Sequence, residues 1–106
     1  MADDTCIFCR ISVGELPSTR VAEDERTLSF MDINPVTTGH ALVIPRAHST
    51  DLHDTDPADL AAVTLAAQRL AARMPAGLGA DGVNLLACSG RAAWQTVFHF
   101  HMHVIP

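Results

Sequence analysis

A run near the end of the chain alternates histidine with apolar residues: Phe98-His99-Phe100-His101-Met102-His103-Val104-Ile105-Pro106. Its apolar members are mostly aromatic or β-branched, which favours a β-strand over residues 98–106. Because successive side chains of a strand point to opposite faces, the three imidazoles would share one face and Phe100, Met102 and Val104 the other. The run therefore predicts a strand that packs through one face and presents three titratable groups on the other.

The rest of the chain predicts an α+β fold with one mostly antiparallel sheet. A long helix is the strongest signal after the histidine run, since it begins at the cap Asp56 with Pro57 in its first turn and Asp59 completing a capping-box-like pair. Its apolar stripe comprises Leu60, Val63, Ala67, Leu70 and Met74, and Pro75, Gly77 and Gly79 would end it. The remaining segments are a helix over 6–13 capped by Thr5 or Asp4, a hairpin of 20–23 with 27–33, strands over 41–44 and 83–87, and a loop over 89–94. One sheet with its helices on one face leaves edges and an open face, which favours dimerisation.

Composition narrows the class of protein. A length of 106 residues predicts one domain, and 48% apolar with 18% charged residues argues against disorder. The net charge of −5 gives no support for a nucleic-acid interface, although a small anion could still bind. No apolar run approaches the length of a membrane span. The three cysteines and the acidic start of the chain argue against a secreted disulfide framework, so the expected location is the cytoplasm.

Three histidines on one face have two plausible chemical uses. Unrelated core histidines are disfavoured, because each buried imidazole needs partners for both of its nitrogens. The histidines could hold a metal together with the C-x-x-C pair Cys6 and Cys9, which has structural-zinc spacing. Alternatively, the middle imidazole could be a nucleophile, with donors for the transition-state charge supplied by residues 89–96. The spacing alone does not separate these two uses.

The motif His99-Phe100-His101-Met102-His103-Val104-Ile105 resembles the histidine triad of the HIT family. The resemblance extends through Gln95-Thr96-Val97-Phe98 and covers nearly the whole chain. Further matching segments, in order, are Cys6–Ile11, Gly14–Pro17, Phe30–Pro35, Gly39–Pro45 and Arg46–His48. The family resemblance implies an α+β fold and a homodimer with one continuous sheet. It also implies a single HIT domain over residues 1–106 that lacks the usual C-terminal tail, and hence either a short family member or a truncated chain.

The resemblance implies a nucleotide hydrolase or transferase that acts at the α-phosphate of phosphoramidates or dinucleoside polyphosphates. In that case His101 would be the nucleophile of a covalent nucleotidyl intermediate, and the chemical step would need no metal. His99 would hold the non-attacking side of the site, His103 would handle charge and protons, and His40 would support them. The implied nucleotide-binding residues are Asp32 on the ribose, Ile33 on the base, Gln95 and Thr96 on the phosphate, and Cys88 and Trp94.

Many bacterial members of the family place zinc on residues that correspond to Cys6, Cys9, His48 and His99, so the resemblance implies a structural zinc ion. Family members often carry asparagine where Cys88 stands and glycine where Trp94 stands. These departures leave two alternatives open. One is a nucleotide-binding protein with impaired catalysis, and the other is a zinc-stabilised interaction module.

Overall fold

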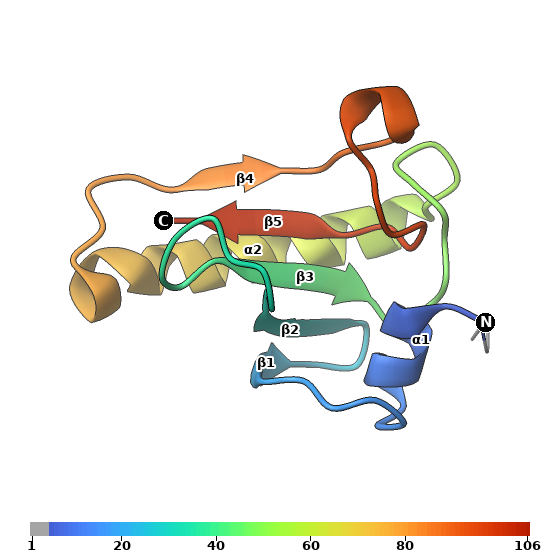
Figure 1. The fold of residues 1–106 in the computed structure, drawn as a ribbon, viewed down its shortest axis with the longest axis horizontal. Helices are drawn as coiled ribbons and strands as arrows, with labels where there is room; N and C mark the ends of the chain where they lie inside the picture. Colours follow the sequence, from blue (N-terminus) through green and yellow to red (C-terminus); the bar gives the residue numbers. More distant parts are fainter. Residues whose placement is uncertain (1–4) are drawn as a thin grey trace.

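The two apolar runs richest in β-branched residues pair at the centre of a sheet. In the computed structural model, which describes residues 5–106, β3 (Ala41–Pro45) lies antiparallel to β5 (Met102–Ile105). The hairpin of β1 (Arg20–Glu23) and β2 (Thr27–Met31) extends the sheet on one side, and β4 (Asn84–Leu86) forms the other edge. All five strands pair antiparallel, in the order β1-β2-β3-β5-β4 (Figure 1). The predicted fold class and the hairpin are confirmed.

The sheet is covered on both faces. Val43 of β3 packs with the long helix α2 (Pro57–Leu78), whereas Leu42 and Ile44 pack with Phe8 of the short helix α1 (Ile7–Ser12). Figure 1 shows α2 running behind the strands and α1 beside the end of β3. The expectation that both helices share one face is therefore wrong. Alternating residues of a strand buried on both faces can anchor two separate layers.

The helix boundaries differ from the prediction in two ways. The cap of α1 is Cys6, whose sulfur accepts from the Cys9 amide at 3.4 Å; Asp4 lies outside the described residues. Helix α2 continues through Pro75 to Leu78, because a proline in the last turn removes only one amide donor. Its stripe packs on the sheet as predicted. Within residues 5–106, neither helix has the length and apolar character to cross a membrane.

The start of α2 also departs from the capping-box expectation. Asp56 accepts a hydrogen bond from the Ala58 amide at 2.7 Å, as a cap should. Asp59 instead forms an ion pair with Arg26 at 3.0 Å, joining the helix to the β1–β2 turn. The apolar stretch 83–87 gives a shorter strand than expected, and β4 is exposed along its whole length because it is an edge. The predicted loop contains a short 3-10 helix, η1 (Arg91–Ala93).

The histidine run is a strand for less than half of the predicted length. Strand β5 begins only at Met102, because the Phe100 amide donates to the carbonyl of Ser49 at 2.8 Å and not to a neighbouring strand. The alternation of side chains is nevertheless confirmed. Phe100, Met102 and Val104 pack toward α2, whereas His99 and His101 contact Phe8 on the opposite face. Of the triad, only His103 lies in the strand.

The turn before β3 offers a direct test of packing. Gly39 has φ +90°, and a β-carbon there would clash with Leu78 at the end of α2 and lie 3.3 Å from Pro106. We expect Gly39→Ala to lower the free energy of unfolding by about 1–3 kcal/mol, measured by urea unfolding. Gly77→Ala is the matched control, because that helical site has open space and should gain about 0.5–1 kcal/mol. Equal effects of the two substitutions would contradict the close approach.

Candidate functional site

His101 is buried at the wall of a cavity, in a defined orientation. Its Nδ1 lies 2.8 Å from the carbonyl oxygen of His99, and since a carbonyl only accepts, Nδ1 carries the proton. Nε2 is then the unprotonated nitrogen of the neutral ring. The cavity, of about 450 Å³, is lined by His101, His103 and His40 together with residues of α1, β2 and the following turn. The arrangement holds a nitrogen lone pair at a cavity wall, which suits a nucleophile.

A second chain of hydrogen bonds fixes His103. The Val36 amide donates to His40 Nδ1 at 3.1 Å, so the proton of the neutral His40 ring is on Nε2. That Nε2–H lies 2.9 Å from His103 Nδ1, which must accept, so His103 carries its own proton on Nε2. Asp32 adds a carboxylate oxygen 3.5 Å from His40 Nε2. His103 is thereby held in the tautomer that can donate a proton through Nε2.

The same hydrogen bonds argue against a metal ion on these three residues. Ligand atoms of Asp32, His40 and His103 do lie within 4.8 Å of one another. A metal on His40 Nε2 would require the proton to move to Nδ1, where it would face the Val36 N–H. Two hydrogens cannot occupy one hydrogen bond. The cluster is built to orient protons.

Burial sets the protonation states of the triad. Loss of hydration lowers the pKa of His101 below its usual value. Burial, reinforced by the neighbouring His101 and His40 rings, lowers the pKa of His103 to about 4. Burial likewise lowers the pKa of His99 to about 4. All three imidazoles are therefore neutral near pH 7, the state in which His101 has a free lone pair.

A second cluster joins α1 to the loop after β3 and to the triad. Its four donor atoms are Sγ of Cys6 and Cys9 and Nδ1 of His48 and His99, all within 4.8 Å of one another. His99 Nδ1 lies 3.3 Å from Cys6 Sγ, 3.5 Å from Cys9 Sγ and 3.3 Å from His48 Nδ1. Cys9 Sγ lies 3.4 Å from His48 Nδ1. The predicted zinc residues are thus brought together.

These separations match a tetrahedral zinc ion. Zinc bonds of about 2.3 Å to sulfur and about 2.05 Å to nitrogen put a nitrogen donor of a tetrahedral site about 3.3–3.6 Å from each of the other donors, the range of the four distances above. His99 Nε2 lies 2.8 Å from the carbonyl oxygen of Pro45, so Nε2 carries the proton and the Nδ1 lone pair faces the cluster. Thiolates and neutral imidazoles are ligands that zinc prefers. The residues present fit the metal.

The predicted nucleotide-binding residues divide into two groups. Asp32, Ile33 and Thr96 line the cavity, and Gln95, Cys88 and Trp94 do not. The Gln95 side chain accepts from the Gly90 amide at 2.8 Å and donates to the carbonyls of Thr50 and Val97, at 2.6 and 3.1 Å. Through these hydrogen bonds, the Gln95 side chain holds the η1 loop against the loop after β3. Its direct contact with a phosphate stays a prediction.

Trp94 lies outside the cavity lining and is 81% exposed. Its φ of +73° is in the left-handed region, which favours glycine. A tryptophan is therefore an unusual residue at this position. The Trp94 amide donates to the Arg91 carbonyl at 3.0 Å within η1. A phosphate contact through this amide would therefore need the turn to rearrange.

One wall of the cavity is formed by residues that the sequence did not mark as functional. Ile7, Phe8 and Ile11 of α1 line it, and Phe8 packs edge-to-face on His101 with ring centroids 5.2 Å apart. A signal was present, because Phe8 and Ile11 share a face of the predicted helix. The Val36 amide was also missed, since no sequence pattern marks a backbone donor.

Comparison with known proteins gives a consistent family. Residues 13–106 match the HIT domain model. The HIT protein of Bacillus subtilis is 40% identical over 103 residues, which is 97% of this chain and 71% of the relative. An adenosine 5'-monophosphoramidase of Schizosaccharomyces pombe is 37% identical over 102 residues, covering 96% of this chain and 74% of the relative. The crystal structure of a zinc-bound histidine triad protein from Mycobacterium smegmatis superposes with a TM-score of 0.94 at 48% identity, over 96% of this chain and 74% of that one. The chain, with its triad on β5 and the segment before it, belongs to the HIT family.

Proposed function

We propose that this protein is a nucleotide hydrolase that cleaves the bond between an α-phosphate and its leaving group through a nucleotidyl-His101 intermediate. The observation that carries the proposal is the orientation of His101, whose Nδ1–H is bonded to the His99 carbonyl while the ring lines the cavity. The monophosphoramidase relative supports the same class of substrate, a nucleoside phosphoramidate.

The chemistry takes two displacements at phosphorus. His101 Nε2 attacks the α-phosphorus, a nitrogen–phosphorus bond forms, and the bond to the leaving group breaks. The leaving amine or alcohol takes its proton from solvent as its bond to phosphorus breaks, while His103 Nε2–H, held in place by the bond from His40 to His103 Nδ1, donates a hydrogen bond to it. A water molecule then attacks the phosphorus and releases its proton to solvent, and the nitrogen–phosphorus bond breaks so that His101 leaves as the neutral imidazole. No residue in this sequence of steps requires a metal.

Three other side chains would place the nucleotide. Asp32 lines the cavity and its carboxylate can accept both ribose hydroxyls, while Ile33 would contact the base. Thr96 lines the cavity and can donate to a phosphate oxygen. Zinc on Cys6, Cys9, His48 and His99 would stabilise the fold around this site.

The stereochemistry at phosphorus tests the intermediate. A nucleoside phosphoramidate with a chiral α-phosphorothioate, hydrolysed in water labelled with a heavy oxygen isotope so that the product phosphorus stays chiral, should give a product with retained configuration, because two inversions cancel. Quenched single-turnover samples, analysed by mass spectrometry, should carry the nucleotide on His101. An inverted product, or a nucleotide attached to another residue, would overturn the covalent route.

The two alternatives make different predictions in the same assay. An impaired enzyme would bind AMP without turning over a phosphoramidate, and an interaction module would not bind AMP. The departures Cys88 and Trp94 lie away from the cavity lining, so they leave the nucleophile and its hydrogen bonds unchanged. This placement favours an active hydrolase.

The pH dependence follows from the lowered pKa values. Since the pKa of His101 is below its usual value of 6.5, the nucleophile becomes half protonated only below that pH. His103, with a pKa of about 4, is still mostly neutral near pH 6. We expect kcat/KM to reach a plateau near neutral pH and to fall to half of it only below pH 6.5. A midpoint of the acid limb at or above pH 6.5, in a series from about pH 4 to 8, would contradict this assignment.

We also propose that the protein is a cytoplasmic homodimer that extends its sheet through β4. This strand is an edge of the sheet, and Leu85 and Leu86 on it are both 44% exposed. Sedimentation equilibrium should give a dimer, and Leu86→Lys should shift it toward monomer. Leu65→Lys, at an exposed position of α2, is the matched control and should leave the dimer intact. A monomeric native chain would contradict the proposal.

A further inference from the structure

Helix α1 is a wall shared by the metal cluster and the cavity. The sulfurs of Cys6 and Cys9 point at His99 and His48. The cavity, in turn, is lined by the apolar residues that lie between and after these cysteines in the sequence, Ile7, Phe8 and Ile11. The two sites are therefore built on one helix of six residues. Anything that moves or orders this helix must affect both.

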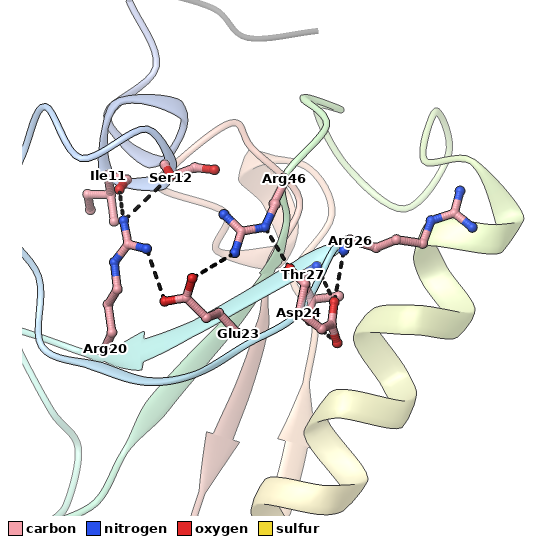
Figure 2. Close-up of polar contacts among 8 residues, drawn as sticks. All are labelled: Ile11, Ser12, Arg20, Glu23, Asp24, Arg26, Thr27 and Arg46. Atoms are coloured by element: carbon pink, nitrogen blue, oxygen red, sulfur yellow. Dashed lines mark hydrogen bonds and ion pairs between the residues drawn. The ribbon is translucent and has the colours of Figure 1, made fainter.

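The helix is too short to be stable alone, since isolated helices below about 12 residues are marginal in water. At its C-terminal end, Arg20 Nη2 donates to the carbonyls of Ile11 and Ser12, at 2.9 and 3.5 Å. Figure 2 shows how this contact continues through Glu23, which pairs with both Arg20 and Arg46 at 3.2 Å. Arg46 also donates to the Asp24 carbonyl at 2.8 Å. In the sequence, Arg46 lies two residues before the cluster residue His48.

These ion pairs are exposed, so they hold α1 only weakly. The stronger attachment is at the N-terminal end, where the Cys6 sulfur both caps the helix and belongs to the metal cluster. Four metal–ligand bonds fix their donors far more firmly than a surface ion pair does. Metal occupancy therefore adds to the packing of Phe8 in the core in ordering this wall of the cavity.

Phe8 connects that order to the nucleophile. Its ring centroid lies 5.9 Å from His99, a residue of the metal cluster, and 5.2 Å from His101, the proposed nucleophile. It is also 5.4 Å from Phe30 in the core and is almost fully buried. A second connection runs through His99, whose Nδ1 belongs to the cluster and whose carbonyl fixes His101.

We propose that Phe8 is a positioning residue that couples the metal cluster to the nucleotide cavity, so that zinc and nucleotide bind with positive cooperativity. The inference rests on the proposed function, because it takes the cavity to be the nucleotide site. Zinc holds α1 in place, and Phe8 passes this order on to His101. The cavity is then already ordered before the nucleotide binds, so binding costs less conformational entropy. Linkage requires the nucleotide to strengthen zinc binding by the same factor.

The test measures both affinities. Calorimetry with AMP should give a dissociation constant about tenfold lower for zinc-loaded than for zinc-free protein. Competition with a chromogenic chelator should show zinc held about tenfold more tightly when AMP is saturating. A protein-free titration of the chelator with zinc and AMP corrects for zinc bound by AMP itself. The two factors should agree, and neither is a measurement of activity.

A pair of variants assigns the coupling to Phe8. Phe8→Leu keeps an apolar side chain but loses the ring contacts with His99 and His101, so the coupling factor should fall well below the native value, and what is left is the part carried by His99. Ile7→Val is the matched control, because Ile7 lines the cavity from the same helix and is half exposed. Its factor should equal that of the native chain. A native factor in Phe8→Leu would overturn the role of Phe8.

The outcomes separate the two proposals. Equal AMP affinity with and without zinc overturns the coupling alone. No AMP binding by the zinc-loaded protein overturns the proposed function and the coupling with it. If the zinc-free protein does not fold, the rate of zinc extraction from the loaded protein carries the test. AMP should then slow extraction from the native chain more than from Phe8→Leu, and no effect on either would overturn the coupling.

Discussion

Substitution of His101 by alanine should reduce kcat for a fluorogenic adenosine phosphoramidate by a factor of about 10⁴ or more. The reason is that the proposed route has no other nitrogen in the same position. His103 is turned to donate a proton through Nε2, and His99 Nδ1 faces the metal cluster. Steady-state fluorescence with native and variant protein measures the loss.

The loss must come from chemistry and not from unfolding. Circular dichroism and AMP calorimetry should show that His101→Ala keeps its fold and still binds the nucleotide, because Asp32 and the α1 wall are untouched. His53→Ala is the matched control: this histidine is exposed in the loop before α2 and should leave kcat unchanged. Undiminished nucleotide release by His101→Ala would remove His101 as the nucleophile.

For the histidine run, the sequence predicted on which side of the backbone each side chain lies, but it did not predict how long the strand is. Alternation in the run 98–106 correctly assigned Phe100, Met102 and Val104 to one side, because an extended backbone alternates whether or not it is paired. The extent of β5 could not be predicted in the same way. It depends on the partner of the Phe100 amide, the carbonyl of Ser49, which no local pattern identifies.

Most of the residues that lie together at the candidate site could be predicted from motifs, whereas their tautomers could not. The tautomers of His99 and His40 depend on the Pro45 carbonyl and the Val36 amide, and these are backbone groups. For Gln95 the family resemblance implies a phosphate contact, but its side chain is engaged by three backbone groups. Such partners are known only once the loops have been placed in space.

Removal of zinc should have the largest effect on stability. Protein purified without added zinc should contain about one ion per chain, because the donor atoms already stand at tetrahedral separations. Stripping the metal should lower the free energy of unfolding by several kcal/mol, on the order of 5 kcal/mol or more. The cluster joins α1 to the loop after β3 and to His99, so these segments lose their common attachment.

Cysteine variants make this prediction specific to the cluster. Cys9→Ser should abolish zinc binding, measured by elemental analysis, and its thermal unfolding should no longer respond to a chelator. Cys88→Ser is the matched control, since Cys88 is a free cysteine outside the cluster and should leave both zinc content and chelator response unchanged. The chelator response separates loss of metal from loss of packing: a buried cysteine replaced by serine destabilises the chain in either case, but only metal loss removes the response. Native zinc content in Cys9→Ser would show that the ion is bound elsewhere.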